Sequence, residues 1–260
     1  MRETEFGPEG AFIRWTEAAG DGPARVHVHG LGAASGPYAA HISAHPALAG
    51  RRTLFVDLPG FGISDRPADF GYSLEDHAGA LAAVLDAAGV RGAEIVGHSM
   101  GGAVAIVLAY RRPELVSRLV LAEANLDPAP VAAADSAVSS RSIAALTEEE
   151  FVHGGGYADT LERAGSTWRA TMRLSDPVAL YRSAVGLVRA TTPTMRAMLE
   201  TLEIPRTFLV GESGFEPPDR AGLLAAGVEV VDVPDSGHCV MFDNPEAYVA
   251  AIRGSAVSPA

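Results

Sequence analysis

The sequence predicts an α/β protein whose mostly parallel sheet is covered by helices on both faces. Short apolar segments that resemble strands alternate with helical segments along the first half of the chain and again near its end, as in parallel sheets. With 260 residues, 48% of them hydrophobic, the chain can bury one large core. The clearest unit is a strand, a sharp turn and a helix around Ser99, within residues 93–110.

Segments that are short, apolar and bounded by Gly, Pro or Asp are expected to be strands. These segments are 12–15, 25–29, 53–57, 93–96, 118–122, 207–211 and 228–233. A helix is expected to follow Ser73, because Asp76 stands three places later as in a capping box, and to end at Gly89. The helix that follows the Ser99 turn ends before Pro113, and a last helix spans 245–252.

The alternation of strands and helices stops between residues 125 and 202. This stretch holds helix-like segments around 142–151, 159–172 and 177–188, and three consecutive glycines at 154–156 are typical of a hinge. We therefore expect residues 125–202 to form a helical cap. The cap would be inserted in a core made of residues 1–124 and 203–260.

The charge and composition exclude several classes of protein. A net charge of −12 disfavours nucleic acid and anionic membranes as partners, since both attract a basic face. The single cysteine, Cys239, has no partner for an internal disulfide. We find no signal-peptide pattern at the N-terminus and no apolar run long enough to span a membrane. These features predict a cytoplasmic protein and leave its oligomeric state open.

The turn Gly97-His98-Ser99-Met100-Gly101 contains the candidate nucleophile. In G-x-S-x-G between a strand and a helix, the glycines allow a tight bend that exposes the serine hydroxyl above the sheet. A serine needs a base to take its proton and a third group to orient that base. His238 is the best base, because it follows the last strand on a loop. The other histidines are less suited to this role. We expect His98 to lie inside the turn and His27 within a strand, and the remaining ones to lie at the surface or in the cap: His41, His45, His77 and His153.

Four motifs in this order resemble the α/β-hydrolase superfamily, and within it the small serine esterases, lactonases and C–C bond hydrolases. The motifs are His29-Gly30, residues 57–64 (DLPGFGIS), the Ser99 turn and Gly237-His238. The resemblance implies an eight-stranded, mostly parallel sheet and a triad in the chain order serine, acid, histidine, or a close variant of that order. Epoxide hydrolases and haloalkane dehalogenases of this fold use an aspartate at the turn, so Ser99 argues against both activities.

The donors for an oxyanion are expected to be two backbone N–H groups. Met100 follows the nucleophile at the start of a helix, where the helix dipole favours negative charge. Leu31 follows the His29-Gly30 turn, as its counterpart does in the family that the chain resembles.

The acid that orients His238 has three candidates. In much of the family it is an aspartate three or four residues after the glycine that ends the penultimate strand, but Gly214 and Phe215 stand there. Glu212 and Glu216 lie nearby. We favour Glu123, which ends the strand after the Ser99 helix, at the sheet edge where active sites gather. Its place is similar to that of the glutamate in zearalenone-type lactonases.

Two other kinds of site are not expected. His27 and His29 share a strand face but lack further ligands nearby, so a metal site is disfavoured. Residues 154–156 are not a phosphate loop, because no lysine follows them. The cap is expected to shape a substrate pocket, and its candidate wall residues are Tyr157, Trp168, Met172 and Tyr181. Gly32, beside Leu31, is a further candidate for substrate binding.

The sequence therefore predicts a serine hydrolase, without metal or cofactor, that cleaves a carboxylic ester or a lactone through an acyl-enzyme on Ser99. A C–C bond hydrolase or lyase that uses the same serine and histidine is one alternative. A hydrolase-like receptor that binds a small ligand without turnover is another. The identity of the substrate stays open.

Overall fold

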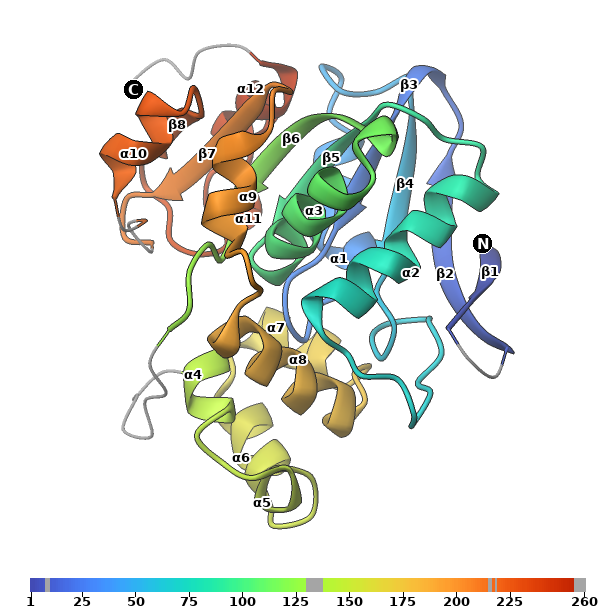
Figure 1. Cartoon of the computed structure of the whole chain (residues 1–260), viewed down its shortest axis with the longest axis vertical. Helices are drawn as coiled ribbons and strands as arrows, with labels where there is room; N and C mark the ends of the chain where they lie inside the picture. The colour runs from blue at the N-terminus through green and yellow to red at the C-terminus, as the bar shows by residue number, and fades with distance from the viewer. Residues whose placement is uncertain (8–9, 130–137, 215–216, 218, 255–260) are drawn as a thin grey trace.

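The computed structural model describes residues 1–7, 10–129, 138–214, 217 and 219–254, which form one eight-stranded sheet with helices on both faces (Figure 1). The strands lie in the order β1-β2-β4-β3-β5-β6-β7-β8. Their bounds are β1 (Arg2–Phe6), β2 (Ala11–Ala18), β3 (Asp21–Val28), β4 (Arg51–Asp57), β5 (Ala93–His98), β6 (Val116–Ala122), β7 (Arg206–Gly211) and β8 (Glu229–Val233).

The sheet is parallel from β4 to β8, and only the pairings of β2 with β1 and with β4 are antiparallel among the described strands. The predicted eight-stranded, mostly parallel sheet is therefore confirmed. In the register of β5 and β6, His98 pairs with Ala122. The next residues, Ser99 and Glu123, consequently leave the sheet side by side at its carboxyl edge.

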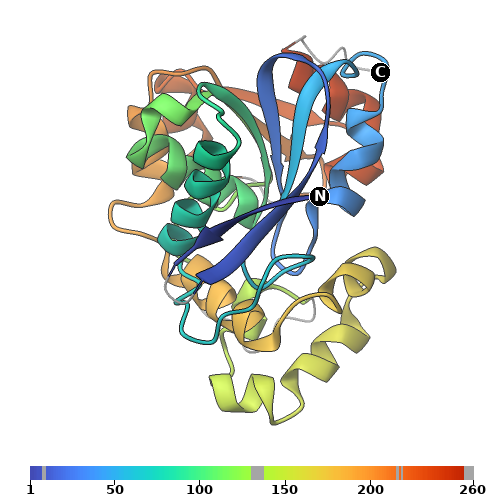
Figure 2. The same ribbon diagram turned by 90° about the vertical axis from the view of Figure 1, so that its right-hand side faces the viewer.

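Helices cover the two faces in separate layers. On one face lie α2 (Leu74–Ala87), α3 (Met100–Arg111) and α9 (Met195–Thr201), and on the other lie α1 (Ser35–Ser43), α11 (Val240–Asp243) and α12 (Pro245–Arg253) (Figure 2). Neighbouring side chains of a strand point to opposite faces. Ile95 accordingly packs in the core under α2 and α3, while Val96 packs in the core under α1 and α12. A further helix, α10 (Arg220–Ala225), joins β7 to β8.

The start of α2 confirms the capping box predicted from Ser73 and Asp76. The Ser73 hydroxyl accepts a hydrogen bond from the Asp76 N–H at 3.0 Å, and the Asp76 carboxylate accepts one from the Ser73 N–H at 3.1 Å. Both bonds satisfy N–H groups that the first helical turn leaves without partners. The helix ends at Ala87, Ala88 is its C-cap, and Gly89 follows with a φ of 64°, close to the predicted end.

The segment between β6 and β7 is helical but more broken than the sequence predicts. It contains α4 (Ser140–Ile143), α5 (Glu148–Val152), α6 (Gly156–Arg163), α7 (Ser166–Met172), α8 (Pro177–Arg189) and α9. The predicted segments 142–151 and 159–172 are each split, because Thr147 caps α5 and Gly165 precedes α7. Helices α4 to α8 lie beyond the carboxyl edge of the sheet (Figure 1). No helix of the described ranges has the length and apolar character to cross a membrane.

His77 is not at the surface, so that expectation is wrong. Its side chain is buried between α2 and α8, and its Nε2 lies 2.9 Å from the Ser183 hydroxyl. The rings of Phe61, Phe70 and Tyr72 lie within about 6 Å of it. Contacts from distant segments, which the helical pattern of α2 alone does not reveal, therefore decide the burial of this histidine.

Burial of histidines makes the stability of the protein depend on pH. Burial lowers the pKa of His27, His77 and His98 to about 3. Between the ordinary histidine pKa of about 6.5 and this value, the unfolded chain binds protons that the folded chain does not. The free energy of unfolding is therefore expected to fall as the pH decreases below about 6.5. Urea unfolding of His77→Gln should show a slope about 1.4 kcal/mol per pH unit smaller than that of wild type in this window. Equal slopes would contradict the assignment for His77.

Candidate active site

Ser99 occupies a sharp turn between β5 and α3. Its backbone angles, a φ of 50° and a ψ of −118°, lie outside the regions that residues other than glycine usually adopt, as expected for a nucleophile turn. A Cβ on Gly97 would lie 2.7 Å from the Gly101 carbonyl oxygen. A Cβ on Gly101 would lie 2.3 Å from the Val28 carbonyl oxygen. Glycine is required at both places because backbone segments meet there.

His238 stands on the loop between β8 and α11, beside Glu123. The His238 Nδ1 lies 3.4 Å from the Glu123 Oε2, a distance typical of a weak hydrogen bond or a loose ion pair. The imidazole is 53% exposed, whereas the glutamate side chain is fully buried. An Nδ1–H that faces a carboxylate leaves the Nε2 lone pair available as a base. In the part of the chain that the structure describes, no hydrogen bond joins the Ser99 hydroxyl to His238.

Glu123 follows β6 with a φ of 52°, and its carboxylate is held at the carboxyl edge of the sheet. Its Oε1 accepts a hydrogen bond from the Gly211 N–H at 2.7 Å. A Cβ on Gly214 would lie 2.3 Å from this same oxygen. The Glu123 carboxylate therefore fills the space of a side chain at position 214, one of the two places where the resemblance to α/β-hydrolases predicts the acid.

The other candidate acids are placed differently. The Glu212 Oε2 accepts a hydrogen bond from the Asp235 N–H at 2.9 Å, which braces the turn before His238. Asp235 has a positive φ of 52°, so this turn needs such a brace. Glu216 lies outside the described residues. Of the two described candidates, Glu123 is the one that the structure brings to His238.

His98 holds the backbone of His238. Its Nε2 lies 2.8 Å from the His238 carbonyl oxygen, and because a carbonyl only accepts, Nε2 carries the proton. The two imidazole rings lie 4.8 Å apart between centroids. Burial, followed by the nearby charge of His238, lowers the pKa of His98 to about 3. His98 is therefore a neutral donor under the candidate base, a role that the sequence analysis did not assign to it.

The two predicted oxyanion donors are available. Within the described residues, neither the Leu31 N–H nor the Met100 N–H donates a hydrogen bond to the protein. The peptide that carries the Leu31 N–H has its carbonyl at Gly30, which accepts from the His29 Nδ1 at 2.8 Å and from the Ala33 N–H at 3.1 Å. These bonds fix the direction of the Leu31 N–H.

His27 and His29 already have partners inside the protein. The His29 Nε2 accepts from the Leu58 N–H at 3.0 Å, which leaves the proton on Nδ1 for the Gly30 carbonyl. The His27 Nε2 lies 2.9 Å from the Ser43 hydroxyl. Burial lowers the pKa of both imidazoles. These hydrogen bonds give the two histidines structural roles in the strand and loop.

The candidate wall residues separate into two groups. Trp168 and Met172 of α7 pack directly on the loop of Leu31, at Gly32. The hydroxyls of the two tyrosines form hydrogen bonds within the segment between β6 and β7. The Tyr157 hydroxyl donates to the Met172 carbonyl, and the Tyr181 hydroxyl donates to the Leu146 carbonyl, both at 2.9 Å. Tyr181 also lines a groove of about 410 Å³ between α2 and α8. The structure thus places Trp168 and Met172, but not Tyr181, against the loop of Leu31.

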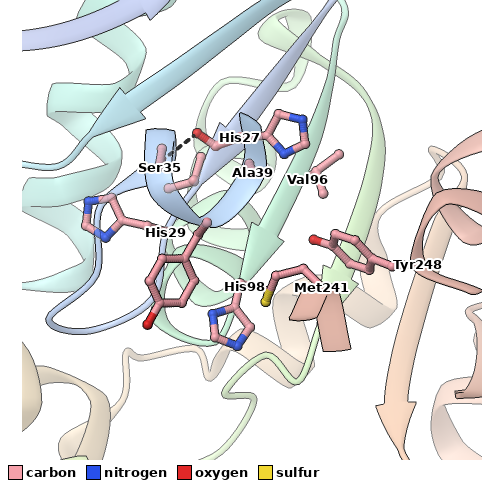
Figure 3. Close-up of a pocket in the computed structure, with 10 residues that line it drawn as sticks. His27, His29, Ser35, Ala39, Val96, His98, Met241 and Tyr248 are labelled. Atoms are coloured by element: carbon pink, nitrogen blue, oxygen red, sulfur yellow. Dashed lines mark hydrogen bonds between the residues drawn. The ribbon is translucent and has the colours of Figure 1, made fainter. Parts of the chain in front are cut away.

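A small cavity lies beside the Ser99 turn, on the face covered by α1 and α12 (Figure 3). It is lined by His27, His29, Ser35, Tyr38, His98 and Met241, among others. Its volume of about 10 Å³ is close to that needed by one water molecule. It is therefore far too small for an organic substrate.

Comparisons with known proteins agree with this architecture. A family model described as alpha/beta hydrolase fold matches residues 26–148. The 2-hydroxymuconate semialdehyde hydrolase of Pseudomonas putida is 42% identical over 102 residues, which are 39% of this chain and 36% of that protein. Haloalkane dehalogenase 2 of Mycobacterium bovis is 29% identical over 220 residues, 77% of each chain. The structure of a thermophilic esterase from Thermogutta terrifontis has a TM-score of 0.76 and 22% identity, and the match covers 98% of this chain and 97% of that one.

The first curated relatives are matched over only about a third of their own length. The matched region of the family model contains the Ser99 turn and Glu123 and stops before His238. The structural match covers almost the whole chain, and at 22% identity it bears on the fold.

The contact between Gly214 and Glu123 gives a prediction about stability. In Gly214→Ala the new methyl group forces the Glu123 carboxylate away from the Gly211 N–H. The free energy of unfolding in urea is expected to decrease by about 1–3 kcal/mol, the cost of losing a buried bond to a charged group. Gly79→Ala is the matched control, because Gly79 is an exposed position in α2 with open space around its Cα, and this variant should be as stable as wild type or more so. A Gly214→Ala protein as stable as wild type would contradict the contact.

Proposed function

This chain belongs to the α/β-hydrolase superfamily, and from that premise we propose that it is a serine hydrolase that cleaves a carboxylic ester or a lactone. The observation that carries the proposal is the meeting of Ser99, His238 and Glu123 at the carboxyl edge of β5 and β6. Ser99 and Glu123 follow paired residues of these strands. His238 reaches the same edge, since its carbonyl is bonded to His98 and its ring faces Glu123.

In the proposed reaction the Ser99 hydroxyl attacks the substrate carbonyl carbon while the His238 Nε2 takes its proton. The oxyanion that forms accepts hydrogen bonds from the Leu31 and Met100 N–H groups. The carbon–oxygen bond then breaks, and His238 returns the proton to the departing alkoxide. Water, deprotonated by His238, releases the acid from Ser99. A lactone would give a hydroxy acid, because its alcohol stays attached to the acyl group.

Glu123 acts in this scheme as the acid of the triad. Its buried carboxylate accepts from the Nδ1–H of His238 and stabilises the imidazolium that forms when Nε2 takes the proton. The division of the chain into a core, residues 1–124 and 203–260, and a cap, residues 125–202, is part of the proposal. It is supported by the position of α7, whose residues contact the loop of Leu31 and Gly32.

The similarity to a haloalkane dehalogenase does not lead us to propose that activity. Dehalogenases of this fold use an aspartate at the turn, and this chain has Ser99 there. C–C bond hydrolysis is the second candidate, and the identity to 2-hydroxymuconate semialdehyde hydrolase favours it. Both candidates use the same serine and histidine. The two activities are separated by incubating the protein with aryl esters, lactones and a vinylogous diketone. A burst of alcohol release from an ester or lactone, as the acyl-enzyme forms, would favour ester or lactone hydrolysis, and turnover of the diketone alone would favour C–C bond hydrolysis.

The first prediction for this proposal concerns the nucleophile. A fluorophosphonate probe should label wild type at Ser99, and Ser99→Ala should be neither labelled nor active while keeping the same circular dichroism spectrum. Hydrolysis of an aryl ester should fall by about 10⁴-fold or more. His238→Ala should lose a similar factor, and the double variant should be hardly slower than either single one, because the two groups act as a unit. If Ser99→Ala kept more than about a tenth of the wild-type rate, Ser99 would not be the nucleophile.

The second prediction compares the two described candidate acids. Glu123→Gln keeps the shape of the side chain and removes the charge that stabilises the imidazolium, so kcat should fall by about 10²-fold to 10⁴-fold. Glu212→Gln is the matched control. It changes an acceptor for the Asp235 N–H and should reduce kcat by less than about fivefold. A collapse of kcat in Glu212→Gln with Glu123→Gln near wild type would reverse the assignment.

A further inference from the structure

Helix α7 of the segment between β6 and β7 is hydrogen-bonded to the backbone of the oxyanion loop. The indole N–H of Trp168 donates to the Leu31 carbonyl at 2.7 Å. The hydroxyl of Thr171, three residues later, lies 3.1 Å from the Gly32 carbonyl oxygen and 3.1 Å from the Trp168 carbonyl oxygen, and it shares its one proton between them. Two consecutive carbonyls of the loop that carries one proposed oxyanion donor are thus held by one helix.

The packing at Gly32 shows how close this contact is. A Cβ at Gly32 would lie 2.9 Å from the Trp168 Nε1 and 3.3 Å from the Met172 side chain. Its φ of 68° also favours glycine. Helix α7 therefore packs on the bare backbone of the loop, and neither can move without changing the other.

The hydrogen bonds fix the backbone on both sides of the Leu31 Cα. The peptide before it, which carries the Leu31 N–H, is held through the Gly30 carbonyl by His29 and Ala33. The peptide after it is held through the Leu31 carbonyl by Trp168. With both planes fixed, φ and ψ of Leu31 are fixed as well. The N–H can then point in one direction only, as a preorganised donor requires.

We propose that Trp168 is a positioning residue for the oxyanion hole, which aligns the Leu31 N–H through the Leu31 carbonyl. The inference rests on the proposed function, since it assumes that Leu31 donates to an oxyanion. It gives the indole a role other than that of a pocket wall. It also makes catalysis depend on the docking of α7, because displacement of this helix releases the loop.

The test is Trp168→Phe, which keeps an aromatic ring and removes the N–H donor. We expect kcat for an aryl ester to fall about tenfold, less than the roughly 10²-fold loss when an oxyanion donor itself is removed, and KM to change by less than about twofold. Binding of an arylboronic acid, which forms a tetrahedral adduct with the serine, should weaken about tenfold, since such adducts resemble the transition state.

The matched control is Trp15→Phe. Trp15 is the only other tryptophan of the chain, and it is a buried residue of β2 with no hydrogen bond to the loop of Leu31 among the described residues. This variant should keep the wild-type kcat and boronic acid affinity. Thr171→Val, which removes the hydroxyl that holds the Gly32 carbonyl, should lower kcat about threefold at constant KM. It tests the same idea if Trp168→Phe fails to fold.

Three results would overturn the inference. Trp168→Phe and Thr171→Val could both match Trp15→Phe in kcat and boronic acid affinity. KM could instead rise with kcat unchanged, which would make Trp168 a substrate wall. The loss in kcat could also occur without any loss in boronic acid affinity. A failure of the proposed function would give a different result. In that case the wild-type protein itself would neither react with a fluorophosphonate nor hydrolyse any ester of the panel.

Discussion

The close approach of three backbone segments at the Ser99 turn is the constraint on which the site depends. Gly101 packs on the carbonyls that end β3, and a Cβ at Gly102 would lie 2.5 Å from the Ala124 Cβ after β6. Strand β5 and helix α3 are thereby drawn between the ends of β3 and β6. Ser99 and Glu123 directly follow β5 and β6, and Leu31 lies three residues beyond the end of β3. A side chain at either glycine would push α3 outward and separate groups that act together in the proposed mechanism.

The carboxylate of Glu123 occupies the space that a side chain at position 214 would fill. The proposed mechanism needs a carboxylate beside His238 at one place in space, and this carboxylate can come from more than one strand. In this chain Gly214 leaves that place empty and Glu123, from the neighbouring strand, occupies it. Glu212 instead braces the turn at Asp235. The absence of a side chain at Gly214 is thus as informative as the presence of the acid at Glu123.

Local patterns in the sequence predict the parts of the fold that depend on local chemistry. The capping box of Ser73 and the turn of Ser99 are examples, because glycine, proline and small polar residues act within a few positions of themselves. Strand β1 was not predicted, since its sequence is short and polar and its order comes from pairing with β2. The burial of His77 depends on contacts with α8, which the local sequence does not contain.

The candidate site follows the same rule. Ser99 and His238 stand out by their motifs, and the sequence leaves three candidates for the acid, because strand pairing and the space at Gly214 are not local properties. Trp168 and His98 could not be assigned as supports of the loops. Each donates to a main-chain carbonyl far away in the sequence, at Leu31 and His238, and a carbonyl leaves no mark on residue identity.

The supports of the two loops share a chemical property that suits a reaction with transient charges. The Gly30, Leu31 and His238 carbonyls accept from aromatic N–H groups of His29, Trp168 and His98. All three donors are neutral, because burial lowers the pKa of both imidazoles and an indole carries no charge. A lysine or arginine in place of His98 would orient the loop equally well, but its cation would oppose protonation of His238. In the proposed mechanism, neutral donors align the base and the oxyanion donor and leave the charge balance to Glu123, His238 and the oxyanion.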